Sequence, residues 1–203
     1  GVFALSGCGR LRCPIQCGAI AVLLQGPADA ELAGLAFDHR AGRVYAADTA
    51  RHVVLSTDAV LDAAPAGSVL WGEARVQGDA GGAATSAARL RAPRGLFLDG
   101  LNHLLYAADT GNGKVRALDL VSMQVSTIVE HLDTPRAVVL EASGEGLFIA
   151  EFGSGRVLRV PLGSSTPIDA RTLPGVIGAT TFGHPTALAL DDSKQELYIA
   201  DDG

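Results

Sequence analysis

Aromatic side chains are scarce in this chain, making up only 5% of its 203 residues. Long apolar runs are also missing, because none approaches the roughly 20 residues of a membrane-spanning helix. The sequence therefore predicts a soluble protein without a membrane span. Basic residues are not in excess, and the net charge is −6. A negative chain with few rings to stack on bases is a poor match for a nucleic-acid partner.

Cysteine occurs only near the start of the chain, at Cys8, Cys13 and Cys17. An odd number of thiols in so short a segment does not form a disulfide framework for a whole fold. Their spacing leaves three interpretations open: free thiols, one local disulfide, or three ligands of a metal ion. Zinc favours four ligands and no histidine lies near them in the sequence, so free thiols are the favoured interpretation. The compartment of the protein stays unassigned.

Glycine is abundant, with 25 residues, and apolar residues make up 48% of the chain. Such a profile is typical of many short strands joined by tight turns. One hairpin-like segment, YAADTGNGKVRAL at 106–118, recurs as YAADTARHVVLST at 45–57, as FIAEFGSGRVLRV at 148–160 and, truncated, as YIADDG at 198–203. A weaker copy, VFALSGCGRLRCP, lies at 2–14. The recurrence indicates a repeat protein built from β-hairpins.

Further apolar segments complete the repeating unit. A run closed by a carboxylate precedes the hairpins, as AGLAFD at 33–38, RGLFLD at 94–99, RAVVLE at 136–141 and TALALD at 186–191. A last strand is expected after the hairpins, at 19–26, 68–73, 125–130 and, more weakly, 169–175. Trp71, in the second of these strands, is expected in the core, with an exposed anchor for a partner as the alternative.

Each unit therefore holds four predicted antiparallel strands in about 40–50 residues, which is typical of a β-propeller blade. A single sheet of this kind has two apolar faces, and radially packed neighbours cover both. This explains ALAL at 187–190, which is apolar on both faces. The sequence predicts an all-β propeller of four-stranded antiparallel blades in one domain, 1–203. The approximate units are 1–31, 32–77, 78–131, 132–183 and a partial unit, 184–203.

The two ends of the predicted propeller can be satisfied in two ways. Either the first two strands of the partial unit join the outer strands of the first unit and close a small ring, or the chain is an incomplete arc of a larger propeller. An open arc would leave apolar blade faces uncovered and favour self-association. The incomplete arc is the favoured interpretation.

The segment GDAGGAATSAARLRAPRGLFLDGLNHLLYAADTGNGKVRALD at 78–119 resembles an NHL repeat. In that family a linker rich in Gly and Ala leads to Pro-x-Gly, an inner strand that ends in Asp, and a hairpin similar to LYVADTGNNRI. The resemblance is good at 135–162 and 185–203, fair at 32–58 and weak at 2–25. It implies a propeller, commonly of six blades. It implies no single function, because the family includes scaffolds, RNA binders, receptor ectodomains and a few enzymes.

One position of the repeat, at the end of the second strand, always holds a carboxylate. Its members are Asp48, Asp109, Glu151 and Asp201. A residue needed once per blade indicates a structural role. Each carboxylate is therefore expected to accept backbone N–H groups of its own hairpin rather than to join a ring of metal ligands. The acids that close the first strands are likewise expected to form turns: Asp38, Asp99, Glu141 and Asp191.

The residue just before each inner strand varies where the rest of the repeat does not. It is Ala33, Arg94, Arg136 or Thr186. In a propeller these positions lie at the mouth of the central channel, so Arg94, Arg136 and Thr186 are the candidates to bind an anionic ligand or an acidic peptide of a partner. For the two arginines the favoured interpretation is that each pairs with an acid of a nearby hairpin, such as Asp109 or Glu151. His184 is the one stray candidate for a metal ligand.

No nucleophile–base pair and no phosphate-binding loop is recognised, so no catalytic residue, metal site or cofactor is assigned. The favoured function is a non-catalytic scaffold that binds a protein or peptide partner through its loops. One alternative is a metal-dependent lyase or lactonase-like enzyme with its channel site partly outside this chain, and another is single-stranded RNA binding. For such enzymes the resemblance implies histidine ligands or a Glu/Asn/Asp calcium cluster at the channel. The four channel-mouth residues supply neither.

Overall fold

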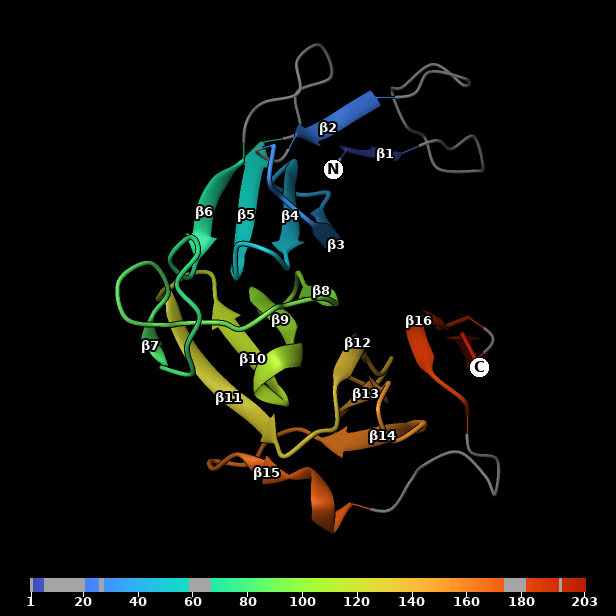
Figure 1. The fold of residues 1–203 in the computed structure, drawn as a ribbon. Helices are drawn as coiled ribbons and strands as arrows, with labels where there is room; N and C mark the ends of the chain where they lie inside the picture. Colours follow the sequence, from blue (N-terminus) through green and yellow to red (C-terminus); the bar gives the residue numbers. More distant parts are fainter. Residues whose placement is uncertain (1, 6–20, 26–27, 59–66, 174–181, 194) are drawn as a thin grey trace.

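The computed structural model describes residues 2–5, 21–25, 28–58, 67–173, 182–193 and 195–203. Within them strands dominate, and the helical segments are two short 3₁₀ turns, Thr110–Asn112 and Ala170–Thr172. The sheets stand side by side around a common centre and form an open arc, with their first strands innermost (Figure 1). This is the all-β propeller architecture that the repeats predict. No helix in this part of the chain is long and apolar enough to cross a bilayer.

The first complete blade runs outwards from the channel in the order β3 (Leu32–Asp38), β4 (Arg43–Asp48), β5 (Val53–Asp58) and β6 (Ser68–Trp71). All neighbours in it are antiparallel. Asp38 shapes its first turn, because the carboxylate accepts hydrogen bonds from the N–H groups of Arg40 and Ala41 at 2.9 and 3.0 Å. Trp71 at the end of β6 is fully buried, in agreement with the expected core position.

The second blade has the same order, β8 (Leu96–Asp99), β9 (Leu104–Asp109), β10 (Lys114–Asp119) and β11 (Gln124–Glu130). Two short strands extend its outer edge. β7 (Gly82–Ala83) pairs with the start of β11, and β15 (Ile168–Asp169) pairs with its end. Asp99 shapes the first turn of this blade by accepting the N–H groups of Leu101 and Asn102.

The third blade contains β12 (Pro135–Leu140), β13 (Gly146–Glu151) and β14 (Arg156–Pro161). The prediction of its last strand at 169–175 is wrong for the described part of that segment. Asp169 belongs to β15, which lies parallel to β11 of the preceding blade, and Ala170–Thr172 is a 3₁₀ turn. The turn begins here because the Asp169 carboxylate accepts the N–H of Arg171 at 3.0 Å and so competes with strand pairing.

Two separate hairpins flank these three blades. They are β1 (Val2–Leu5) with β2 (Ala21–Gln25), and β16 (Pro185–Asp191) with β17 (Glu196–Asp201). Each is a two-stranded sheet of its own, so the ring closure considered above is not seen among the described strands (Figure 1). Cys8, Cys13 and Cys17 lie outside the described residues.

One face of the β16–β17 hairpin is not covered by any described segment. Tyr198 of β17 is 51% exposed, whereas Tyr45 and Tyr106 at the same repeat position are 3% and 2% exposed. The same residue type is thus buried where a neighbouring blade packs on it and exposed where none does. The arc is open at this hairpin.

The hydrophobic core lies between neighbouring blades. Tyr45 and Trp71 of the first blade pack with Leu105 of the second, and Tyr106 packs with Ile149 in a cluster at the next junction. Burial of apolar surface contributes about 25 cal/mol per Å². Radial packing therefore buries both faces of the second blade, which lies between the two clusters.

Glycine lets the innermost strands approach each other closely. A Cβ atom on Gly34 would lie 2.0 Å from the carbonyl oxygen of Arg94, and a Cβ atom on Gly95 would lie 2.5 Å from that of Arg136. Both distances are shorter than a real Cβ atom allows, so glycine alone fits these crossings without a backbone shift. The channel-mouth residues beside the two glycines are therefore held close together.

Candidate functional site

The four repeat carboxylates tie the linker before each blade to the end of its second strand. Each accepts a backbone N–H group that lies 17 or 18 residues upstream. The pairs are Glu31 to Asp48, Arg91 to Asp109, Asp133 to Glu151 and His184 to Asp201, at 3.2, 2.7, 2.8 and 2.7 Å. These linkers have N–H groups without strand partners, and the carboxylates satisfy them.

The repeat pattern predicts that these carboxylates accept N–H groups of their own hairpins. In the structure they accept N–H groups of the preceding linker instead, with one exception. Among the described residues, a backbone donor from the same hairpin is found for Asp48 alone, from the N–H of Arg51 at 3.1 Å. Asp109 instead takes a side-chain donor from its hairpin, the Asn112 amide at 2.8 Å. The linker supplies the donor because it packs against the end of the strand. The repeat pattern does not reveal this packing.

Arginines of the third strands partner two of these acids, Asp109 and Glu151. Arg116 is 1% exposed and donates from Nε to Asp109 Oδ2 at 2.8 Å, and Arg156 donates from Nε to Glu151 Oε2 at the same distance. Burial raises the pKa of Asp109 and outweighs its hydrogen bonds and the charge of Arg116. The carboxylates are thus engaged in the frame of the blades. In the part of the chain that the structure describes, no three His, Cys, Asp or Glu side chains are grouped to hold a metal ion.

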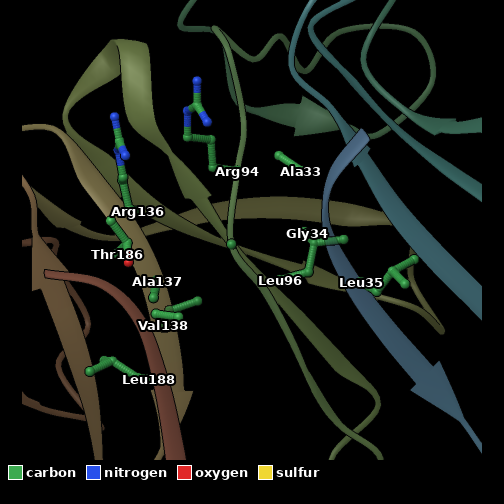
Figure 2. Close-up of a pocket in the computed structure, with 12 residues that line it drawn as sticks. Ala33, Gly34, Leu35, Arg94, Leu96, Arg136, Ala137, Val138, Thr186 and Leu188 are labelled. Carbon is green, nitrogen blue, oxygen red and sulfur yellow. The ribbon is translucent and has the colours of Figure 1, made fainter. Parts of the chain in front are cut away.

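The channel-mouth residues line one pocket at the centre of the arc (Figure 2). Three successive residues in each of the four inner strands, or leading into it, line the pocket: 33–35, 94–96, 136–138 and 186–188. The pocket has a volume of about 290 Å³. The structure thus brings Arg94, Arg136 and Thr186 together from three different blades.

Neither arginine pairs with the acids considered from the sequence. Arg94 Nη2 lies 3.8 Å from Glu31 Oε1, and the Glu31 side chain is 61% exposed. For the Arg136 guanidinium group, no hydrogen bond or ion pair is found among the described residues, and its buried Nε has no acceptor there. Burial lowers the pKa of Arg136 and the charge of Arg94 lowers it further, whereas Asp202 acts in the opposite direction. Figure 2 shows both arginine side chains projecting to the same side of the pocket.

Phe152, which follows the repeat carboxylate of the third blade, holds Arg136 in place. The guanidinium carbon of Arg136 lies 3.3 Å from the centroid of the Phe152 ring, which is a cation–π contact. The His184 ring stacks on Phe152 with centroids 4.5 Å apart, and its Nδ1 lies 3.0 Å from the Phe152 carbonyl oxygen. His184, the stray metal candidate, is therefore part of an aromatic stack.

The two preceding blades carry threonine where the third carries Phe152. Thr49 donates its hydroxyl to the carbonyl oxygen of Pro93 at 2.9 Å, and Thr110 donates to that of Pro135 at 2.7 Å. Each hydrogen bond joins one blade to the next. The sequence reasoning missed Phe152, although a signal was present: the residue after the repeat carboxylate is threonine twice and then phenylalanine.

Comparison with known proteins supports the fold. No protein-family model matches the sequence, and no curated protein is significantly similar to it. A chain of a nidogen/laminin complex is similar in structure, with a TM-score of 0.67 and 18% identity over 91% of this chain and 61% of that one. A gluconolactonase from Xanthomonas campestris gives a TM-score of 0.66 and 16% identity over 90% of this chain and 59% of that one.

A virginiamycin B lyase from Staphylococcus aureus is a third neighbour, with a TM-score of 0.59 and 12% identity over 86% of this chain and 50% of that one. These structures are β-propellers, and the chain is a β-propeller too. It spans between half and about three fifths of the length of these neighbours. They include named enzymes and a chain of a nidogen/laminin complex, so the fold alone does not separate a scaffold from an enzyme.

Proposed function

We propose that this chain is a non-catalytic propeller of the NHL type that serves as a protein-interaction scaffold and binds an acidic segment of a partner at the channel mouth. The observation that carries the proposal is that Arg94 and Arg136 lie over one pocket with donors to spare. Arg94 has one ion pair, a 3.8 Å contact with exposed Glu31, and for the Arg136 guanidinium group none is found among the described residues. Guanidinium groups with free donors select carboxylates, because the planar fork matches both oxygens.

The composition of the pocket supports binding rather than chemistry. Apart from Arg94, Arg136 and Thr186, its described lining consists of glycine, alanine and aliphatic residues. General acid–base catalysis needs a titratable group near neutral pH within reach of the substrate. Among the lining residues there is no His, Cys, Asp, Glu, Lys or Tyr. A rigid frame with a cationic mouth is suited to holding a partner.

The proposal includes one propeller domain over 1–203 with repeat units near the boundaries given above. Recurrent contacts support this division. The linker-to-carboxylate hydrogen bond occurs at Asp48, Asp109, Glu151 and Asp201, and the threonine hydrogen bond joins consecutive blades. The uncovered face of the β16–β17 hairpin is where self-association would occur.

An array of acidic peptides tests the proposed function. The array pairs each Asp/Glu-containing peptide with its Asn/Gln counterpart, and the double variant Arg94→Ala/Arg136→Ala is compared with the wild-type chain. A matched control is Arg40→Ala/Arg171→Ala, which removes the same charge from exposed sites outside the pocket. We expect acidic peptides to bind the wild type and the control at least about tenfold better than the channel variant. Equal binding to the channel variant would reject the proposal.

A further inference from the structure

The junction between the third blade and the β16–β17 hairpin differs from the two junctions before it. At those two, a threonine donates a hydrogen bond to a proline carbonyl of the next blade. Here Phe152 occupies the threonine position, and its ring contacts the guanidinium group of Arg136. With phenylalanine in place of threonine, this junction lacks the side-chain hydrogen bond to a proline carbonyl. It has instead an aromatic ring that binds a cation at the channel mouth.

Arg136 is thereby held at the pocket with its donors unused. Its Nε is buried without an acceptor in the described part of the chain, which is an unfavourable state for a charged donor. Arg94 stands beside it and makes only a 3.8 Å contact with exposed Glu31. Two guanidinium groups on one side of a pocket repel each other unless an anion lies between them. The pair therefore forms a cradle for an oxyanion.

Aliphatic side chains form part of the lining of the pocket beneath this cradle. Leu35, Leu96, Val138 and Leu188 line it, and Figure 2 shows Val138 and Leu188 on the side opposite to the guanidinium groups. Its volume of about 290 Å³ lies just below the roughly 300–1,000 Å³ that is typical of ligand pockets. A pocket of this size takes one small hydrocarbon group and no folded segment.

We propose that this pocket binds an aliphatic carboxylate, with the carboxylate between Arg94 and Arg136 and a branched hydrocarbon group among the aliphatic side chains. The inference rests on the proposed function, since it names the ligand chemistry of the same channel mouth. Two sources share this chemistry: the C-terminal end of a peptide that finishes in leucine, isoleucine or valine, and a free branched acid. Phe152 is a positioning residue in this site, because it acts through Arg136.

The inference is tested by titrating the full chain with small ligands and monitoring binding through the backbone amide signals in NMR spectra. The probes are isocaproate, its neutral amide, acetate, inorganic phosphate, and a short leucine-terminated peptide with a free or an amidated end. We expect isocaproate to shift the signals of the pocket residues with a dissociation constant of about a millimolar. The amide and acetate are expected to bind about tenfold more weakly, because each lacks one half of the ligand.

Two variants and a control separate the site from general effects. Arg136→Met keeps the aliphatic stem and removes the charge, and Phe152→Thr installs the residue found at Thr49 and Thr110. Both are expected to lower the affinity for isocaproate about tenfold. Arg40→Met, an exposed turn residue outside the pocket, is expected to bind like the wild type. Melting temperatures show whether each variant is folded.

The outcomes distinguish the ligand sources and the two proposals. Binding of the free-ended peptide but not of its amide assigns the ligand to a chain end, and binding of isocaproate alone assigns it to a free acid. Phosphate binding as tight as isocaproate, no shift of pocket signals, or unchanged affinity of a folded Arg136→Met variant would overturn the inference. If internal acidic peptides bind while isocaproate does not, the scaffold proposal stands and the aliphatic site fails.

Discussion

Methionine substitutions at Arg116 and Arg136 are expected to change the free energy of unfolding differently, because Arg116 stabilises the fold and Arg136 lies at the pocket. Arg116 is 1% exposed and donates to Asp109 Oδ2 at 2.8 Å and to the carbonyl oxygen of Ala80 at 3.0 Å. Arg116→Met fills the space but leaves the buried Asp109 carboxylate without its cation. Removing one partner of a buried ion pair lowers the free energy of unfolding by about 3–5 kcal/mol. We expect a loss of this size.

Arg136→Met has two opposing effects on the free energy of unfolding. The lost cation–π contact with Phe152, seen at 3.3 Å, costs about 0.5–2 kcal/mol. Removal of a desolvated donor that has no acceptor recovers about 1–3 kcal/mol. The net change in the free energy of unfolding is therefore expected to lie between a loss of about 1 kcal/mol and a gain of about 2.5 kcal/mol.

Urea denaturation measures both variants, with the fluorescence of Trp71 as the probe, because its ring is fully buried at the junction of the first two blades. Circular dichroism provides a second probe of the same transition. A loss of about 3 kcal/mol or more for Arg136→Met would show that this arginine also holds the fold. A neutral Arg116→Met variant would refute the argument from the buried ion pair.

Three further predictions concern the frame. Thr110→Val should lower the free energy of unfolding by about 1 kcal/mol, because the Pro135 carbonyl loses its hydrogen-bond donor. Thr110→Ser keeps a hydroxyl donor and should retain most of the wild-type stability. A denaturant midpoint unchanged in Thr110→Val would contradict this. Gly95→Ala should cost about 1–3 kcal/mol or more by calorimetry, since its Cβ would lie 2.5 Å from the Arg136 carbonyl oxygen; a stable variant would show that the inner strands can separate. Burial raises the pKa of Tyr106 to about 12 from its ordinary value of 10.0, so its contribution to stability is present below pH 10 and lost between pH 10 and about 12. Tyrosinate absorbance of the wild type against Tyr106→Phe measures this ionisation, and a transition near pH 10 in the folded state would refute it.

Much of the architecture was predictable from local patterns. The hairpins and inner strands fall where the recurring apolar runs, carboxylates and glycines placed them, because strand alternation and turn chemistry act over a few residues. The last strand of the third blade was not predictable in this way. Asp169 pairs with Glu130 of the preceding blade, and such pairing depends on how neighbouring sheets pack.

The candidate site was predictable in part. Alignment of the repeats singled out Arg94, Arg136 and Thr186 as equivalent and variable positions, and all three line one pocket. The contact of Arg136 with Phe152, and of Phe152 with His184, was not predictable. These residues are far apart along the chain and meet only across a blade junction.

Spacing along the chain is enough to reveal a repeated β-hairpin unit with a carboxylate and a channel-mouth residue at set positions. Which side chains meet depends on how the blades pack. This packing placed Arg94 beside Arg136, left the Arg136 Nε without an acceptor in the described part of the chain, and put Phe152 in contact with the guanidinium group. The physical reason is that radial packing brings residues of different blades within contact distance, whereas spacing along the chain describes each blade alone.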